Sequence, residues 1–457
     1  MTGVRVFCGK KITIMGLGLL GRGVGVAEFL ARHGAELIIT DLKPPEKLIN
    51  SIEKLKAYKD RITYVLGEHR LADFENRDMI IKAAGVPIDS LYIAHARKSG
   101  VLVEMDASLF AQLTPKGVTI IGVTGTRGKS TVTHLIFNIL KLARKRAYLG
   151  GNVRGVATLP LLEQVRSGDY VAMELDSWQL QGFGEAKISP KVAVFASFME
   201  DHMNYYKGSM KAYFADKAKI FKYQKAGDIV VSGVELGKTM GKKIMVSENS
   251  LPKDWKLKLV GKHNRLNAAL AWKVGLELGI EQEVVKKAIE AFAAVEGRLQ
   301  SMGKVGGMEV YNDNNATTPQ ATVAGLTALD EGKRDIVLIM GGADKRLDMR
   351  PLVEKISKAC RVVVLLAGSG TEKVKKDIHG LNGVKVREGE RLEEVVRIGF
   401  EEAKKGERLL FSPAFASFGK YFENEYERND LFVKLMKKIQ NLDKCHFWID
   451  NIHYEHY

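Results

Sequence analysis

The sequence has few cysteines and no long hydrophobic run. Its 457 residues include three cysteines, Cys8, Cys360 and Cys445, which are far apart and form no Cys-x-x-Cys pair. This spacing argues against a zinc site and fits a reducing compartment. No segment reaches the roughly 18 uninterrupted apolar residues of a membrane span, and residues 1–11 lack the apolar core and cleavage site of a signal peptide. We therefore expect a cytoplasmic protein.

Acidic residues are also in the minority. The chain has 70 Lys and Arg against 54 Asp and Glu, which gives a formal net charge of +16. A basic protein could bind nucleic acid, but the lysines are dispersed over many segments, such as 141–146 and 253–262, and no recognition helix or aromatic RNA-binding signature is present. A basic surface that serves anionic small substrates is the favoured alternative. We expect neither a nucleic-acid nor a membrane partner.

The length is too great for one ordinary hydrophobic core, and the composition, 46% hydrophobic and 27% charged, is that of a globular protein. Apolar strand-like runs alternate with helical stretches, which predicts an α/β fold with largely parallel sheets. We place the domains at 1–114, 115–298 and 299–440, followed by a tail at 441–457. The tail histidines His446, His453 and His456 could suggest a metal site, but a loosely ordered terminus is the favoured alternative.

Residues 120–131 indicate a nucleotide phosphate site. An apolar run leads into Thr124-Gly125-Thr126-Arg127-Gly128-Lys129-Ser130-Thr131, and a helical stretch follows at 132–142. Glycines at 122, 125 and 128 would let the backbone curl so that N–H groups and a helix N-terminus face a polyphosphate, while Lys129 reaches the outer phosphates. Ser130 or Thr131 would hold magnesium. The strict P-loop pattern requires glycine at 123, where this chain has valine.

A second glycine-rich turn lies near the N-terminus. An apolar strand from Lys11 runs into Gly16-Leu17-Gly18-Leu19-Leu20-Gly21, a helical stretch covers 24–33, and a second strand at 36–40 ends at Asp41. This is the dinucleotide-type fingerprint of a β-α-β unit. It predicts a nucleotide diphosphate over the turn with Asp41 near a ribose or base; the alternative is a tight turn without a ligand.

Three further residues follow strands of the central segment. Glu174 ends an apolar strand, where a carboxylate can reach a magnesium ion held by the phosphate site. His202 comes just after the strand at 192–195, and Lys217 lies in a helical stretch beyond it. Each has a structural alternative: a partner for a buried base, a helix cap, and a solvated helix face, respectively.

Together with Gly150-Gly151-Asn152, the run Gly261 to Ala269 and Glu296-Gly297-Arg298, these residues resemble, in order and spacing, the ATP-dependent Mur ligase family. The resemblance extends from Ile12 to about Lys437. Asp313-Asn314-Asn315-Ala316-Thr317 is similar to the Asp-x-x-Ala-Thr form of members that add D-glutamate, and Gly341–Lys345 and Ser412–Phe418 resemble their other substrate loops. Three positions differ from those members: Asn315 where lysine is usual, Leu20 where a small hydroxyl residue is usual, and Asn429 where glycine is common.

The resemblance implies a three-domain architecture with an N-terminal Rossmann-like domain for a UDP-linked substrate, a central P-loop ATPase-like domain, and a C-terminal Rossmann-like domain for the amino acid. It implies a monomeric, ATP-dependent amide ligase that adds D-glutamate to UDP-N-acetylmuramoyl-L-alanine through an acyl phosphate, in peptidoglycan precursor synthesis. The alternatives are a related Mur or folylpolyglutamate-type ligase that adds a different amino acid, a P-loop ATPase or kinase that forms no amide, and a basic nucleic-acid-binding protein.

The resemblance also assigns site residues. It implies catalytic roles for Lys129, Asn152, His202 and Lys217, and ATP binding by Gly125, Thr126, Gly128, Lys129, Ser130, Thr131, Asn267, Arg298 and Asp313. Two Mg²⁺ ions would be held by Ser130 with Glu174 and by His202 with Lys217. A lysine ammonium cannot ligate a cation, so the family resemblance implies that Lys217 is carbamylated by CO₂. The UDP substrate would lie on Gly18, Leu19, Leu20, Gly21 and Asp41, and D-glutamate on Thr317, Lys345, Ser417 and Phe418.

Overall fold

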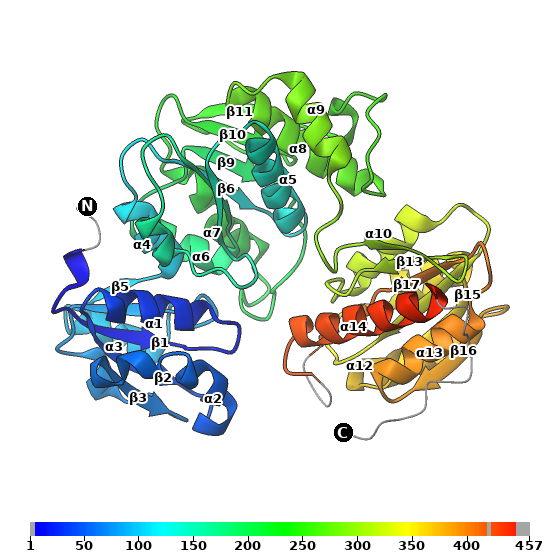
Figure 1. Cartoon of the computed structure of the whole chain (residues 1–457), viewed down its shortest axis with the longest axis horizontal. Helices are drawn as coiled ribbons and strands as arrows, with labels where there is room; N and C mark the ends of the chain where they lie inside the picture. Colours follow the sequence, from blue (N-terminus) through cyan, green and yellow to red (C-terminus); the bar gives the residue numbers. More distant parts are fainter. Residues whose placement is uncertain (1–4, 418–421, 445–457) are drawn as a thin grey trace. The chain divides into compact units, whose positions relative to one another are not determined.

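The computed structural model describes residues 5–417 and 422–444. The chain divides into two compact units, one formed by Met1–Trp255 with Leu266–Ile289 and the other by Lys256–Arg265 with Glu290–Tyr457. Figure 1 shows three sheets along the chain: one in the blue N-terminal segment, one in the cyan-to-green segment and one in the yellow-to-red segment. The predicted α/β architecture with largely parallel sheets is therefore confirmed.

The first sheet has five parallel strands in the order β3-β2-β1-β4-β5. Its strands are β1 Lys11–Met15, β2 Glu36–Asp41, β3 Ile62–Leu66, β4 Met79–Lys82 and β5 Leu102–Glu104; its helices are α1 Arg22–Arg32, α2 Pro45–Glu53, α3 Leu91–Lys98 and α4 Asp106–Leu113, with 3-10 turns η1 Arg5–Phe7, η2 Lys56–Arg61 and η3 Leu71–Phe74. The strand order reverses at β1, so the loop after β1 opens at the topological switch point, where α/β sheets bind ligands.

The second sheet has six parallel strands in the order β11-β10-β9-β6-β8-β7. Its strands are β6 Thr119–Thr124, β7 Ala147–Gly151, β8 Tyr170–Glu174, β9 Val192–Phe195, β10 Ile229–Ser232 and β11 Lys242–Met245; the helices of this segment are α5 Lys129–Leu142, α6 Ser177–Glu185, α7 Met210–Lys222, α8 Lys262–Glu277 and α9 Gln282–Ala291, with η4 Leu159–Glu163 and η5 Glu248–Ser250. Strand β6 lies between β8 and β9, so the loops after these three strands open at one edge.

The two sheets of the first unit share one hydrophobic core. Buried residues of α1, such as Phe29, belong to the same cluster as Leu161 of η4 and Phe183 of α6. The buried carboxylate of Asp106, at the start of α4, accepts hydrogen bonds from the backbone N–H groups of Thr158 (2.9 Å) and Leu159 (2.6 Å). The N-terminal and central segments are thus joined by apolar packing and by a buried polar contact.

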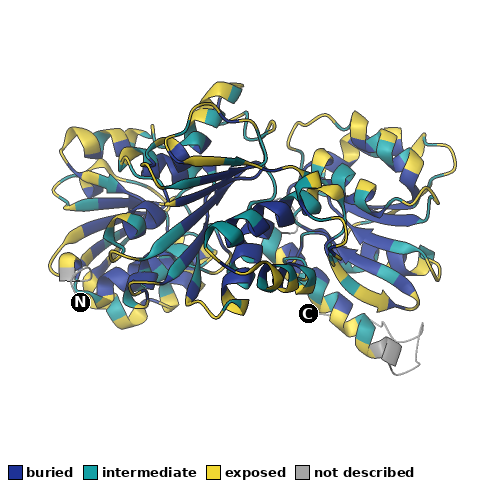
Figure 2. Ribbon diagram, turned by 90° about the horizontal axis from the view of Figure 1, so that it is seen from above, coloured by how far each residue is buried: buried dark blue, intermediate teal, exposed yellow. Residues whose placement is uncertain are grey.

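The third sheet has the order β12-β13-β17-β14-β15-β16; β12 is antiparallel to β13 and the remaining pairs are parallel. Its strands are β12 Gln300–Val305, β13 Met308–Asn312, β14 Ile336–Gly341, β15 Cys360–Leu366, β16 Lys385–Gly389 and β17 Arg408–Phe411; its helices are α10 Pro319–Leu329, α11 Arg350–Ala359, α12 Ser369–His379, α13 Leu392–Glu402 and α14 Glu425–Lys444. Strand β14 is buried along its whole length, and separate apolar clusters cover the two faces of the sheet. Figure 2 shows the same pattern, with buried strands and exposed outer helix faces.

The last described helix overlaps the start of the predicted tail at 441–457. Helix α14 continues through Lys444, and its apolar face packs on the sheet with Phe432 and Met436 buried and Ile439 partly buried. Residues 445–457, with His446, His453 and His456, lie outside the described residues, as does Phe418. None of the helices within 5–417 and 422–444 has the length and apolar content needed to cross a bilayer.

Candidate functional site

The predicted phosphate loop lies between β6 and α5, and two of its glycines are required by close contacts. At Gly128 the backbone φ is +87°, and a Cβ atom would lie 2.4 Å from Asn267 Oδ1. At Gly125 a Cβ atom would lie 2.9 Å from the backbone N of Ser197. The role predicted for Gly122 is wrong: this residue lies inside β6 and is needed because a Cβ atom would meet the Pro190 ring at 2.5 Å.

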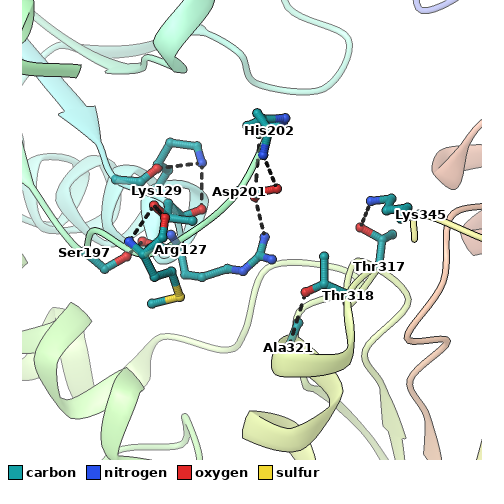
Figure 3. Close-up of polar contacts among 12 residues, drawn as sticks. Arg127, Lys129, Ser197, Asp201, His202, Thr317, Thr318, Ala321 and Lys345 are labelled. Atoms are coloured by element: carbon teal, nitrogen blue, oxygen red, sulfur yellow. Dashed lines mark hydrogen bonds and ion pairs between the residues drawn. The ribbon is translucent and has the colours of Figure 1, made fainter. Parts of the chain in front are cut away.

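Lys129 begins α5 directly after the phosphate loop, and its side chain lies over that loop (Figure 3). Its Nζ donates to the carbonyl oxygens of Gly125 (3.0 Å) and Thr126 (3.2 Å). The loop is also held from β9, because the Ser197 hydroxyl accepts from the backbone N of Arg127 (2.8 Å) and donates to its carbonyl oxygen (2.9 Å). The ammonium group and the helix N-terminus therefore face the same concave turn, as polyphosphate binding requires.

Two metal-ligand candidates flank this turn. Ser130 is in the first turn of α5, and Glu174 is the last residue of β8, next to β6 in the sheet. The Glu174 side chain is buried, and none of the ion pairs among the described residues involves it. Since a buried carboxylate without a counter-charge is costly, the site suits a bound cation. In the described part of the chain, no group of three or more His, Cys, Asp or Glu side chains is placed so that it could hold a metal ion by itself.

Lys217 of α7 lies beneath the same loop. It is 1% exposed, and its Nζ donates to the carbonyl oxygen of Gly125 at 2.9 Å. Burial lowers the pKa of Lys217 well below its usual range, and the nearby positive charge of Lys129 lowers it further. This is not the predicted alternative of a solvated helix face: the side chain is an internal amine that favours the neutral form.

His202 lies after β9 in a left-handed conformation, with a φ of +56°. Its ring is 4.8 Å from that of Trp178, centroid to centroid. Burial lowers the pKa of His202, and the charge of Asp201 opposes that shift. Asp201 Oδ2 in turn lies 3.4 Å from Arg127 Nη1 (Figure 3). Burial thus favours the neutral imidazole, and the backbone of His202 has a strained conformation of the kind found at functional sites.

The N-terminal glycine-rich turn has the geometry that its pattern predicted. Gly16, Gly18 and Gly21 all have positive φ values, of 97°, 66° and 83°. Asp41 Oδ2 accepts from the backbone N of Gly18 at 2.9 Å. Leu20 at the tip of the turn is 49% exposed. The structure thus brings Asp41 to the turn and shows that its carboxylate holds the turn itself.

Asn152 follows β7 at the same edge of the second sheet. Its backbone N donates to the carbonyl oxygen of Glu174 at 2.7 Å. Its side-chain Oδ1 accepts from Nη2 of Arg22 at 3.0 Å. Sequence reasoning missed Arg22, Ser197 and Asp201, because no local motif links residues of the first sheet or of the loop after β9 to the phosphate loop.

In the second unit, the candidates form a local group around the ends of β13 and β14. Asp313 Oδ1 accepts from the backbone N of Leu299 (2.9 Å), and Oδ2 accepts from the Ser412 hydroxyl (2.8 Å). Lys345 Nζ donates to the Thr317 hydroxyl at 3.0 Å (Figure 3). The segment before Ser417 pairs with the Lys345 loop through the bridge Ala343–Ala416. Arg298 belongs to this unit, whereas Asn267 belongs to the first.

Comparisons with known proteins agree over most of the chain. Family models described as Mur ligase MurD-like N-terminal domain, Mur ligase middle domain, and Mur ligase glutamate ligase domain match residues 10–104, 123–236 and 297–415. A UDP-N-acetylmuramoylalanine–D-glutamate ligase from Roseiflexus sp. (strain RS-1) is 32% identical over 94% of this chain and 98% of its own length. The enzyme of the same name from Borreliella burgdorferi (strain ZS7) is 32% identical over 93% and 97%.

Solved structures show the same fold at lower identity. The UDP-N-acetylmuramate-alanine ligase MurC of Thermotoga maritima aligns over 94% of this chain and 99% of its own, with a TM-score of 0.60 and 21% identity. MurF from Acinetobacter baumannii aligns over 96% and 93%, with a TM-score of 0.54 and 14% identity. These likenesses show a three-domain α/β fold.

Proposed function

The chain belongs to the Mur ligase family, and from this premise we propose that it is the ATP-dependent ligase that joins D-glutamate to UDP-N-acetylmuramoyl-L-alanine during peptidoglycan precursor synthesis. The observation that carries the proposal is the phosphate loop, whose Lys129 ammonium group lies over the carbonyls of Gly125 and Thr126 beside the buried Glu174 and Lys217. The full-length similarity to D-glutamate ligases supports the choice of acceptor.

The reaction joins groups that repel one another. The alanyl carboxylate attacks the γ-phosphorus of ATP and ADP leaves; the amine of D-glutamate then attacks the acyl carbon, phosphate leaves, and the amine loses a proton. Carboxylate and triphosphate are both anionic, so cations and N–H dipoles must neutralise their approach. Lys129 and the amides of the loop between β6 and α5 hold the outer phosphates, and Asn152 and His202 hold the acyl phosphate.

We assign two Mg²⁺ ions to this edge of the sheet. Ser130 and Glu174 would hold one ion, and the burial of Glu174 without an ion pair among the described residues fits that role. His202, kept neutral by burial, and Lys217 would hold the second. Magnesium supplies charge neutralisation between the phosphates and the incoming carboxylate.

The role of Lys217 requires chemical modification, since an ammonium group repels a cation. We propose that Lys217 is carbamylated: the neutral amine attacks CO₂ and a proton is released, which leaves a carbamate anion. The lowered pKa of Lys217 favours the neutral amine that this step needs. Its burial beside the carbonyl of Gly125 puts the new anion at the phosphate loop.

The acceptor site is assigned to the second unit. D-glutamate carries two carboxylates, and anions that leave water need cationic or hydrogen-bonding partners. Lys345 supplies the charge, and the hydroxyls of Thr317 and Ser417 supply donors. Arg298 and Asp313 would bind ATP from this unit, while the turn at 18–21 and Asp41 would bind the uridine diphosphate. Domain divisions at 114 and 298, a monomeric state and a cytoplasmic location complete the proposal.

Release of ADP and phosphate tests the proposal. The purified protein is given ATP, Mg²⁺ and UDP-N-acetylmuramoyl-L-alanine, with a panel of D-glutamate, L-alanine, L-lysine and diaminopimelate. D-glutamate should support the fastest release, and omission of either the carboxylate or the amine should abolish it. If another amino acid outcompetes D-glutamate, the chain is a related ligase with a different acceptor. If ATP is hydrolysed without an acceptor, the ligase assignment fails.

A further inference from the structure

Arg22 connects the two ligand-binding edges of the first unit. It is the first residue of α1, directly after the glycine-rich turn that ends at Gly21. Its Nη2 donates to Oδ1 of Asn152 at 3.0 Å, across 130 residues of sequence. Its Nε is buried and has no hydrogen-bond partner among the described residues. The Asn152 contact is thus the one side-chain hydrogen bond that the described structure gives this guanidinium group.

The backbone of Asn152 is fixed independently of Arg22. Gly151 has a φ of +75°, and a Cβ atom there would lie 2.0 Å from the carbonyl oxygen of Glu174. That same carbonyl accepts the backbone N–H of Asn152 at 2.7 Å. The Thr158 hydroxyl accepts from the backbone N of Gly151 at 2.9 Å. The main chain at 151–152 is therefore fixed against the end of β8. These backbone contacts do not fix the orientation of the Asn152 side-chain amide.

An asparagine amide can present either its oxygen or its NH₂ group to a ligand. A guanidinium group has donors and no acceptor, so Arg22 can bond only to Oδ1. This contact turns the NH₂ group of Asn152 away from Arg22. Carboxylates, phosphates and acyl phosphates offer acceptors only, so the NH₂ group is the end that the reaction can use.

We infer that Arg22 is a positioning residue that fixes the Asn152 amide with its NH₂ group toward the reacting acyl group. The inference rests on the proposed function, in which Asn152 holds the acyl phosphate. Because Arg22 begins the helix that follows the glycine-rich turn, it also links the position of the bound UDP moiety to that of the reacting carboxylate.

A double-mutant cycle between Arg22 and Asn152 tests the inference. R22M should lower kcat about tenfold or more, the size expected when one charge-assisted hydrogen bond is lost. It should leave the KM of ATP and the calorimetric Kd of UDP within about twofold. In the N152A background, R22M should change kcat by less than about twofold, because its effect acts through the missing amide. Additive losses, or a weaker grip on UDP with unchanged kcat, would overturn the inference.

Two further sets of variants separate positioning from folding. Arg32 lies on the same helix and forms an ion pair with Glu163 of η4 at 2.9 Å. R32M therefore removes an arginine contact of similar sequence separation that does not involve Asn152. This variant should keep wild-type kcat. R22K retains a donor-only cation, whereas R22Q can offer its own oxygen and leaves the amide orientation undetermined. R22K should therefore be faster than R22Q, and the reverse order would contradict the inference even if R22M does not fold.

The chemical step can be examined without D-glutamate. Hydroxylamine attacks an acyl phosphate to give a hydroxamate and inorganic phosphate, so hydroxamate yield reports formation of the acyl phosphate. R22M should reduce this yield in the same proportion as kcat. A wild-type protein that forms hydroxamate but prefers another amino acid would refute the D-glutamate assignment and leave the Arg22 cycle valid. Wild-type hydroxamate with an unchanged yield in R22M would refute the Arg22 inference alone.

Discussion

Replacement of Lys217 by methionine should stabilise the protein while abolishing its activity. The amine is 1% exposed, and burial and the charge of Lys129 hold its pKa well below 10.5. Between the folded pKa and 10.5, the unfolded chain therefore binds more protons at this site than the folded protein does. The wild-type free energy of unfolding consequently falls as the pH falls through this window, by up to about 1.4 kcal/mol per pH unit. Methionine binds no proton in this pH range, so the unfolding free energy of K217M lacks this pH dependence.

The K217M substitution leaves the Gly125 carbonyl oxygen with a hydrogen-bond donor. Methionine keeps most of the volume of the lysine stem, and the Gly125 carbonyl still accepts from Lys129 Nζ at 3.0 Å. The difference in unfolding free energy between K217M and wild type should thus increase in favour of K217M from pH 10 down to the folded pKa of Lys217 and then level off. Denaturant unfolding at a series of pH values in CO₂-depleted buffer, where Lys217 is the free amine, measures this difference.

Lys219 provides the matched control. It lies on the same helix two residues later and forms an ion pair with Asp216 at 2.7 Å, outside the phosphate loop. K219M should show no pH-dependent gain of this kind. With ¹³C-bicarbonate, a carbamate signal should appear in wild type and K219M and be absent from K217M, and acetate should partly restore K217M activity by supplying an anion. Parallel pH profiles for K217M and wild type would refute the reasoning about burial.

Three further variants test other parts of the site. K129M should lower the rate of ADP release about a hundredfold or more with an unchanged melting temperature, since it removes charge directed at phosphate and no core packing; retention of a tenth of the wild-type rate would contradict this. G128A should lose ATP affinity because its Cβ would lie 2.4 Å from Asn267 Oδ1, whereas G168A, with a similar φ of +89° and open space around it, should keep that affinity. K345M should raise the KM of D-glutamate far more than that of ATP, as steady-state kinetics would show.

The local elements could be predicted because each depends on residues close in sequence. The apolar run at 120–123 and the glycine-rich turn after it specify a strand, a loop and a helix, and the structure has β6, the loop and α5 there. The role of Gly122 could not be predicted in this way. Its lack of a side chain is explained by the Pro190 ring, which comes from a distant segment that packs beside β6.

The sequence could not predict which groups on neighbouring strands are hydrogen-bond partners of the site side chains. Its place at the end of the second strand predicts Asp41 near a ribose or base, and the structure shows in addition that its Oδ2 accepts from the backbone N of Gly18 at 2.9 Å. The spacing in sequence between the glycine-rich turn and an acidic residue at the end of the second strand is the same whether or not the carboxylate bonds to the turn. Whether the carboxylate also reaches the turn depends on a distance in the folded protein, which a pattern of residue types does not contain.

Asn315 and Asn429, two differences from the family pattern in the second unit, contact the same turn. Asn315 Nδ2 lies 3.5 Å from the Glu296 carbonyl oxygen, and Asn429 Nδ2 donates to Glu296 Oε1 at 2.6 Å. Both side chains also approach Gly297, where the φ is +73°. A glycine at 429 has no side chain for this contact, so the asparagine there braces the same turn that Asn315 contacts. Asn315 and Asn429 therefore both support, as neutral side chains, the turn that carries Arg298.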